Sequence, residues 1–139
     1  MDTVRVKWSG GRRFVGRDEA VHDVVMDAAV AHKGDGSGAR PLELVLYALG
    51  GCTGIDVISI LEKQRQEVRD FELLITAEQR EEQPRYYERI NIEYVLTGVD
   101  LKPSAVERAI MLSEDKYCSV KGMFGQGVSV MTSYRIIDV

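Results

Sequence analysis

Two cysteines, Cys52 and Cys118, are the residues of this chain best suited to redox chemistry. A cysteine thiolate is a strong nucleophile, and nearby cations favour it over the thiol. Lys116 and Lys121 are such cations close to Cys118 in the sequence. The two cysteines form no CxxC motif, so spacing alone does not pair them. Each can equally be a buried, inert thiol that fills space in a core.

The surroundings of Cys52 allow two interpretations. Gly50, Gly51 and Gly54 flank it, and such small neighbours can open a narrow pocket over the sulfur. They can also serve only to let a helix pack closely against its neighbours. Asp56 follows Cys52 by four residues, which places both on one face of a helix.

Asp56 is a candidate site residue because a carboxylate in an apolar stretch is costly unless it is paired. The alternative is a structural partner: Arg12, Arg13, Arg40 or a backbone N–H. A carboxylate beside a thiol raises the thiol pKa, so reactivity at Cys52 also requires a nearby cation.

Glu43 precedes Cys52 by nine residues, so the two side chains leave a straight helix on opposite sides. Glu43 either takes part in catalysis or only stabilises the helix by placing a negative charge at the positive, N-terminal end of its dipole.

His22 and His32 have no metal-ligand spacing to the cysteines, so we expect no metal. The glycine-rich segment 34–38 lacks the P-loop ending, and we expect no nucleotide or other cofactor.

The elements that must position these residues follow from the hydrophobic pattern. Strands are expected at 4–8, from 14 and at 24–26, with a turn at 9–12 and a flexible, mobile loop at 31–40. A helix is expected over 42–66, with Pro41 at its start, then strands at 71–78 and 90–96, a helix at 103–112 ending near Cys118, and a strand at 128–137. The order β-β-β-α-β-β-α-β predicts an α+β fold.

Length and composition predict one domain, residues 1–139, with 45% hydrophobic residues and a net charge of −4. This charge argues against nucleic-acid binding. No apolar run approaches the ~20 residues of a membrane span and no signal peptide is evident, so we expect a cytoplasmic protein without a membrane. Because the helix at 42–61 is apolar on nearly every face, we expect a homodimer that buries it.

Two segments carry a resemblance to a known family. RPLELVLYALGGCT, residues 40–53, resembles the central helix of the OsmC/Ohr family, and EDKYCSV, residues 114–120, resembles its second-cysteine motif. The resemblance implies an OsmC-like fold, an interlocked homodimer with long central helices enclosed by antiparallel sheets. It also implies thiol-dependent reduction of organic hydroperoxides, with Cys52 as peroxidatic and Cys118 as resolving cysteine. The implied partners are an organic hydroperoxide and a dithiol reductant, lipoyl-type or thioredoxin-like.

The sequence at the helix start differs from that of the better-known family members. Those members carry an acidic residue directly after the proline, and this acid pairs with a catalytic arginine. Leu42 occupies that place and the acid is Glu43, as in a Pro-x-Glu-Leu branch with Gly-Gly-Cys. Arg12 is the nearest match for the arginine, and Arg13 is the alternative. Two other functions stay open: a non-peroxidatic ligand-binding or redox-sensing protein, and a structural dimer with inert cysteines.

Overall fold

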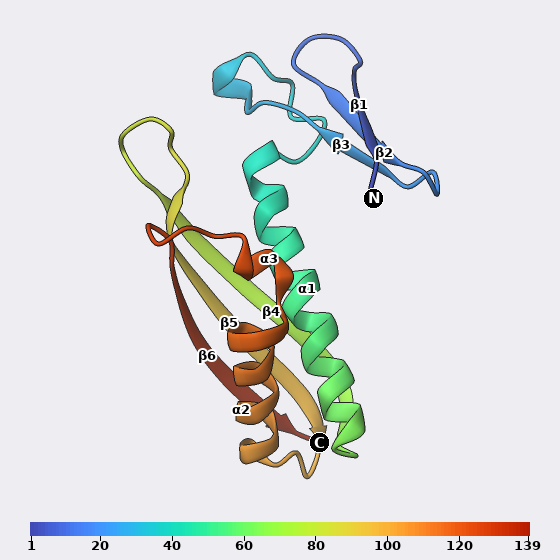
Figure 1. The fold of residues 1–139 in the computed structure, drawn as a ribbon, viewed down its shortest axis with the longest axis vertical. Helices are drawn as coiled ribbons and strands as arrows, with labels where there is room; N and C mark the ends of the chain where they lie inside the picture. The colour runs from blue at the N-terminus through green and yellow to red at the C-terminus, as the bar shows by residue number, and fades with distance from the viewer. The chain divides into compact units, whose positions relative to one another are not determined.

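The computed structural model describes residues 1–139, and the chain divides into two compact units, Met1–Leu46 and Tyr47–Val139. The order of strands and long helices is the predicted β-β-β-α-β-β-α-β, with three short helical turns added (Figure 1). The α+β class is therefore confirmed. That residues 1–139 form a single domain stays a prediction.

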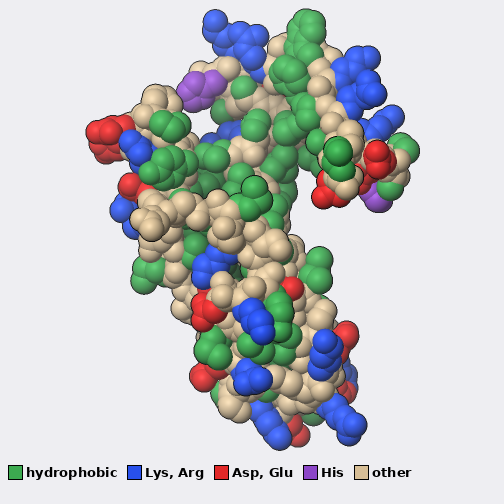
Figure 2. All heavy atoms as spheres, viewed as in Figure 1, with side chains coloured by type: hydrophobic (Ala, Val, Ile, Leu, Met, Phe, Trp, Pro, Cys, Tyr) green, Lys and Arg blue, Asp and Glu red, His purple; other side chains and the backbone are tan.

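The first unit contains a three-stranded antiparallel sheet in the order β1 (Val4–Trp8), β2 (Phe14–Asp18), β3 (Asp23–Met26). In the turn between β1 and β2, Gly10 and Gly11 have φ angles of 104° and 54°, which favour glycine. Trp8 pairs with Phe14 across the hairpin, and its indole N–H donates to the Gly11 carbonyl at 3.0 Å. Hydrophobic side chains of this sheet lie at the surface, as Figure 2 shows in green.

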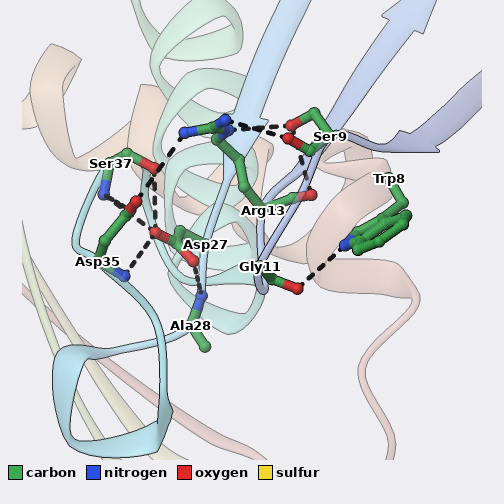
Figure 3. A network of polar contacts seen from close by, with 8 residues as sticks. All are labelled: Trp8, Ser9, Gly11, Arg13, Asp27, Ala28, Asp35 and Ser37. Atoms are coloured by element: carbon green, nitrogen blue, oxygen red, sulfur yellow. Dashed lines mark hydrogen bonds and ion pairs between the residues drawn. The ribbon is translucent and has the colours of Figure 1, made fainter.

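The segment after β3 begins with η1 (Val30–His32) and is anchored by the buried Asp27 (Figure 3). Its carboxylate accepts the N–H groups of Ala28, Asp35 and Ser37 at 2.8–3.1 Å and the Ser37 hydroxyl at 3.0 Å. The contact with the Asp35 side chain and the N–H groups of Ser37 and Asp35 together hold the pKa of Asp27 well below its usual value.

Two glycines of this loop are required by close backbone contacts. A Cβ on Gly34 would lie 1.7 Å from the Ala28 carbonyl oxygen, and one on Gly38 would lie 2.7 Å from the Val25 carbonyl oxygen. The sequence predicted a flexible, mobile loop because it is rich in glycine. In the structure, Gly38 lets the chain lie close to Val25 of β3, and Gly34 lets it lie close to Ala28. That the loop is mobile stays a prediction.

The second unit contains a mixed sheet in the order β4 (Glu67–Gln79), β5 (Tyr87–Val99), β6 (Ser129–Asp138). β4 and β5 are antiparallel and joined by a hairpin, whereas β5 and β6 are parallel. The expected all-antiparallel arrangement is therefore wrong for this last pair. The reason is that helices return the chain from the end of β5 to the edge where β5 began, and such a crossover produces parallel neighbours.

The helices of the second unit, the first of which enters the unit at Tyr47, cover one face of this sheet (Figure 1). α1 spans Pro41–Lys63, close to the predicted 42–66, and α2 spans Pro103–Leu112 as predicted. A π-helical turn, η2 (Ser113–Tyr117), and a single turn, α3 (Ser119–Gly122), follow α2. β5 is the most buried strand, and its Tyr94 stacks on Phe71 of β4 with ring centroids 6.3 Å apart.

Within one chain α1 buries only one stripe, spaced at four-residue intervals: Leu49, Thr53, Val57 and Leu61. Two apolar residues on its other face, Tyr47 and Ile55, are 64% and 68% exposed. The predicted burial on every face is therefore not achieved by a single chain. α1 is also long and apolar enough to cross a membrane by length and composition, a test that the core helix of a soluble protein passes as well.

Candidate functional site

The second unit brings Cys52 and Cys118 together. Cys52 lies near the middle of α1 and is partly exposed, whereas Cys118 lies between η2 and α3 and is buried. Cys118 is held there by its own backbone N–H, which donates to the Ser113 carbonyl at 2.7 Å. Side-chain hydrogen bonding and electrostatic interaction with Cys52 both act on the Cys118 thiol, so the two sulfur atoms are neighbours.

The environment of Cys118 favours the protonated thiol. Burial raises its pKa, and the neighbouring Cys52 raises it further. The backbone N–H of Lys121 opposes this shift by donating to the Cys118 sulfur at 3.4 Å. The cation of Lys121 is directed elsewhere, because its ammonium group lies 3.6 Å from a carboxylate oxygen of Glu114.

The three glycines around Cys52 have different surroundings. A Cβ on Gly50 would lie 2.9 Å from Ile75 Cδ1, and one on Gly54 would lie 3.4 Å from Leu73 Cδ1. These two glycines therefore allow α1 to lie close on β4, which is the packing interpretation. Gly51 differs, because a Cβ there would meet no atom within 4 Å. Open space next to Cys52 is thus provided at Gly51 alone.

Asp56 lies at one end of a row of polar side chains that crosses the core of the second unit. Its Oδ2 accepts the Ser113 hydroxyl at 2.8 Å, and Ser113 Oγ lies 2.8 Å from Thr53 Oγ1. Thr53 Oγ1 lies 2.9 Å from the Tyr94 hydroxyl, which donates to Glu114 Oε2 at 2.7 Å. None of the arginines considered as partners of Asp56 fills this role.

The Glu114 end of the row is also well supplied with donors. Thr132 of β6 donates its hydroxyl to the Glu114 carboxylate at 2.7 Å and 2.8 Å, in addition to the nearby Lys121. The three hydroxyl residues in the middle of the row are fully buried. Burial is the main cause that raises the pKa of Tyr94; its bond with Thr53 acts against this, and the bond to Glu114 adds to it.

Sequence reasoning missed the inner members of this row. Thr53 and Glu114 lie within the two cysteine motifs, but neither these two residues nor Ser113 and Tyr94 were predicted as site residues. The available signal was the same one that identified Asp56: a polar side chain on a helix face or strand face that is otherwise apolar. Thr53 occupies such a position in α1, between Leu49 and Val57.

Glu43 has a structural role within the first unit. Its carboxylate accepts both the backbone N–H and the side-chain Nε of Arg40 at 3.1 Å. Because Arg40 immediately precedes α1, this is the reciprocal half of a capping box. The Arg40 N–H and guanidinium keep the pKa of Glu43 low. The interpretation of Glu43 as a residue that stabilises the helix start therefore has direct support.

The two candidate arginines lie in the first unit and neither pairs with Glu43 of the same chain. Arg12 is exposed in the β1–β2 turn, and its guanidinium donates to the carbonyl of Gly11 at 3.5 Å. Arg13 donates to Ser9 and approaches Asp35 at 4.0 Å (Figure 3). The structure also contains no cluster of three or more histidine, cysteine or acidic side chains suited to a metal ion.

Comparison with known proteins gives matches over the whole chain. The family model described as OsmC-like protein matches residues 34–133. Protein YhfA of Escherichia coli (strain K12) is 46% identical over 133 residues, covering 96% of both chains. The structure of a hypothetical protein from Aquifex aeolicus VF5 has 31% identity and a TM-score of 0.87, covering 100% of this chain and 98% of the other. The organic hydroperoxide resistance protein OhrB of Bacillus subtilis has 19% identity and a TM-score of 0.61, covering 97% and 98%, which is a likeness of fold.

Proposed function

The chain belongs to the OsmC-like family, and on that premise we propose that it is a thiol-dependent peroxidase that reduces organic hydroperoxides through Cys52 and Cys118. The observation that carries the proposal is the adjacency of the two thiols, of which Cys52 is the more accessible and Cys118 the buried, protonated one. This asymmetry suits an attacking cysteine and a resolving cysteine.

The proposed reaction has three steps. The Cys52 thiolate attacks the terminal oxygen of the hydroperoxide, the O–O bond breaks, and the alkoxide leaves as an alcohol after taking a proton. Cys52 is then a sulfenic acid. Cys118 condenses with it to form a disulfide and release water, and an external dithiol reduces the disulfide to restore both thiols.

An organic rather than an inorganic peroxide is supported by the apolar surface next to Cys52. Tyr47, Gly51 and Ile55 are spaced four residues apart along α1 and are all exposed, so they form an apolar strip beside the cysteine. An alkyl or acyl chain can bury surface against such a strip, whereas hydrogen peroxide has no apolar part to bury.

The same strip supports a homodimer as the working form. OsmC/Ohr proteins are generally dimeric, and a single chain leaves this face of α1 uncovered. In a dimer the covering chain would supply the cation that activates Cys52, for which Arg12 and Arg13 are the candidates; Glu43 would act only through Arg40. The proposed enzyme is cytoplasmic. Its proposed reductant is a lipoyl-type or thioredoxin-like dithiol.

The test is consumption of cumene hydroperoxide with dihydrolipoamide as reductant, with hydrogen peroxide as the comparison substrate. Wild type should turn over and prefer the organic peroxide. Cys52→Ser should be inactive, and Cys118→Ser should accumulate a sulfenic acid that dimedone traps on Cys52. Wild-type turnover no faster than that of Cys52→Ser would rule the peroxidase out in favour of a ligand-binding or sensing role.

A further inference from the structure

The polar row from Asp56 to Glu114 contains more hydrogen bonds than its hydroxyl groups can supply. Its four oxygen–oxygen separations are 2.8, 2.8, 2.9 and 2.7 Å, all within the range of O–H···O hydrogen bonds. Each such bond needs one proton between its two oxygens. The hydroxyls of Ser113, Thr53 and Tyr94 carry one proton each, which makes three.

The fourth proton must come from a carboxyl group at one end of the row. If both Asp56 and Glu114 were ionised, one contact in the buried middle would place two oxygen lone pairs together without a proton. Two acceptors forced together in a low-dielectric interior repel each other and are left unsatisfied at a high free-energy cost. One extra proton removes this defect and completes all four bonds.

The two ends differ in how well they stabilise a negative charge. Glu114 receives the Tyr94 and Thr132 hydroxyls and the Lys121 ammonium group, so protonating it would weaken three contacts that its negative charge strengthens. Asp56 receives one donor, the Ser113 hydroxyl. With the proton on Asp56, the carboxyl becomes the donor in its contact with Ser113, and the three hydroxyls then all donate in one direction, from Asp56 toward Glu114.

We propose that Asp56, Ser113, Thr53, Tyr94 and Glu114 form a buried proton relay that holds one proton beyond those of its hydroxyls, with Asp56 as the resting carrier. A row of this kind moves a proton from end to end without moving heavy atoms, because each oxygen accepts one proton as it passes on another. The relay crosses the core between α1, η2 and β5.

One end of the relay shares a helix face with Cys52, and the other end shares a contact residue, Lys121, with Cys118. Asp56 is one helical turn beyond Cys52 on the same face of α1. At the other end, Lys121 contacts both Glu114 and the Cys118 sulfur. Tyr94 also interacts electrostatically with the Cys118 side chain. The relay therefore connects the surroundings of the buried thiol with those of the accessible one.

This arrangement suits the condensation step, a role that rests on the proposed peroxidase function. Cys118 gives its proton to the Glu114 end, and its sulfur attacks the Cys52 sulfenic sulfur. The S–S bond forms, the S–O bond breaks, and the leaving hydroxide takes the Asp56 proton to become water. The three hydroxyls then rotate toward Asp56, and passage of one proton from Glu114 to Asp56 along them restores the relay, so protons and electrons balance.

The resting proton is tested without any turnover, by infrared spectroscopy of the reduced protein at neutral pH. Wild type should show the C=O stretch of one protonated carboxylic acid, shifted in D₂O and absent from Asp56→Asn. The asparagine amide still donates to Ser113, so this variant should fold. Glu107→Gln is the matched control and should retain the band. Absence of the band from wild type, or its persistence in Asp56→Asn, would overturn the proposal.

Transfer along the relay is tested with two tyrosine variants. Tyr94 and Tyr134 both donate to a glutamate, but the Tyr134–Glu107 pair lies outside the relay. After one equivalent of cumene hydroperoxide, Tyr94→Phe should form its Cys52 sulfenic acid normally and then its disulfide on the order of 100-fold more slowly than Tyr134→Phe. Equal disulfide rates in the two variants would refute transfer. Failure to form the sulfenic acid in wild type would instead refute the proposed function.

Discussion

At the scale of single residues, the two cysteines differ because their surroundings differ. Cys118 has only 6% of its surface exposed and its pKa is raised, first by burial and then by Cys52. A thiol whose pKa is raised on folding keeps its proton to higher pH than the unfolded chain does. The protonated Cys118 thiol therefore contributes to the free energy of unfolding below the ordinary thiol pKa. This contribution is lost as the pH rises above that value.

We expect iodoacetamide to label Cys52 before Cys118 at neutral pH, because only an accessible thiolate reacts quickly. Labelling of Cys118 should begin to rise only above the ordinary thiol pKa of about 8.5. Mass spectrometry of quenched samples over a pH series measures both sites, and the unfolded protein in urea is the control in which they should become equivalent. Faster labelling of Cys118 in the folded protein would contradict this expectation.

The sequence predicted which residues belong to the site better than it predicted which residues they contact. Cys52, Cys118 and Asp56 were identified from residue type and spacing, and the family match confirms the resemblance seen in the two cysteine motifs. The partner of Asp56 was not predictable, because Ser113 is 57 positions away and only the packing of η2 against α1 brings it near. The Arg40–Glu43 contact was not predicted either, because from the sequence Arg40 was considered only as a partner of Asp56.

At the scale of elements, close contacts between strands are determined by glycine. Gly98 lies in β5 opposite Val68 of β4 and next to Asp138 of β6. A Cβ at this position would lie 2.3 Å from the Glu67 carbonyl oxygen and 2.8 Å from Leu101 Cγ. Because the first contact is with backbone, the strands themselves would have to separate to admit a methyl group.

We therefore expect Gly98→Ala to lower the free energy of unfolding by about 1–3 kcal/mol, the usual cost of overpacking a tight site. Gly122→Ala is the matched control, since a Cβ there would meet no atom within 4 Å. Urea denaturation followed by circular dichroism gives both values. If Gly98→Ala were as stable as Gly122→Ala, the prediction would be wrong, and the backbone at the end of β5 would move at little cost to admit the methyl group.

At the scale of the whole molecule, the apolar strip of α1 is an exposed surface that one chain leaves uncovered. The hydrophobic pattern correctly predicted a long apolar helix, but it could not show which stripe one chain covers by itself. Which face of α1 is covered depends on where β4 lies. Gly50 and Gly54 lie on the face that packs against β4. The remaining face is the part of the molecule for which a homodimer is proposed.

We expect sedimentation to give twice the 15.6 kDa of one chain for wild type. Ile55→Glu should shift the protein toward the monomer, because it places a charge in the surface that a partner would bury. Val139→Glu, which adds the same charge at an exposed residue of the C-terminus, should remain dimeric. A wild type that sediments as a monomer at every concentration would contradict the proposal.

The position of Trp8 has a practical consequence for spectroscopy. It is the only tryptophan, it lies in the β1–β2 hairpin of the first unit, and both cysteines belong to the second. Intrinsic tryptophan fluorescence therefore reports on the hairpin, and tyrosine signals are needed to follow the core around Tyr94. The chain carries a separate optical label for each of its two compact units, so their unfolding transitions can be recorded independently in one sample.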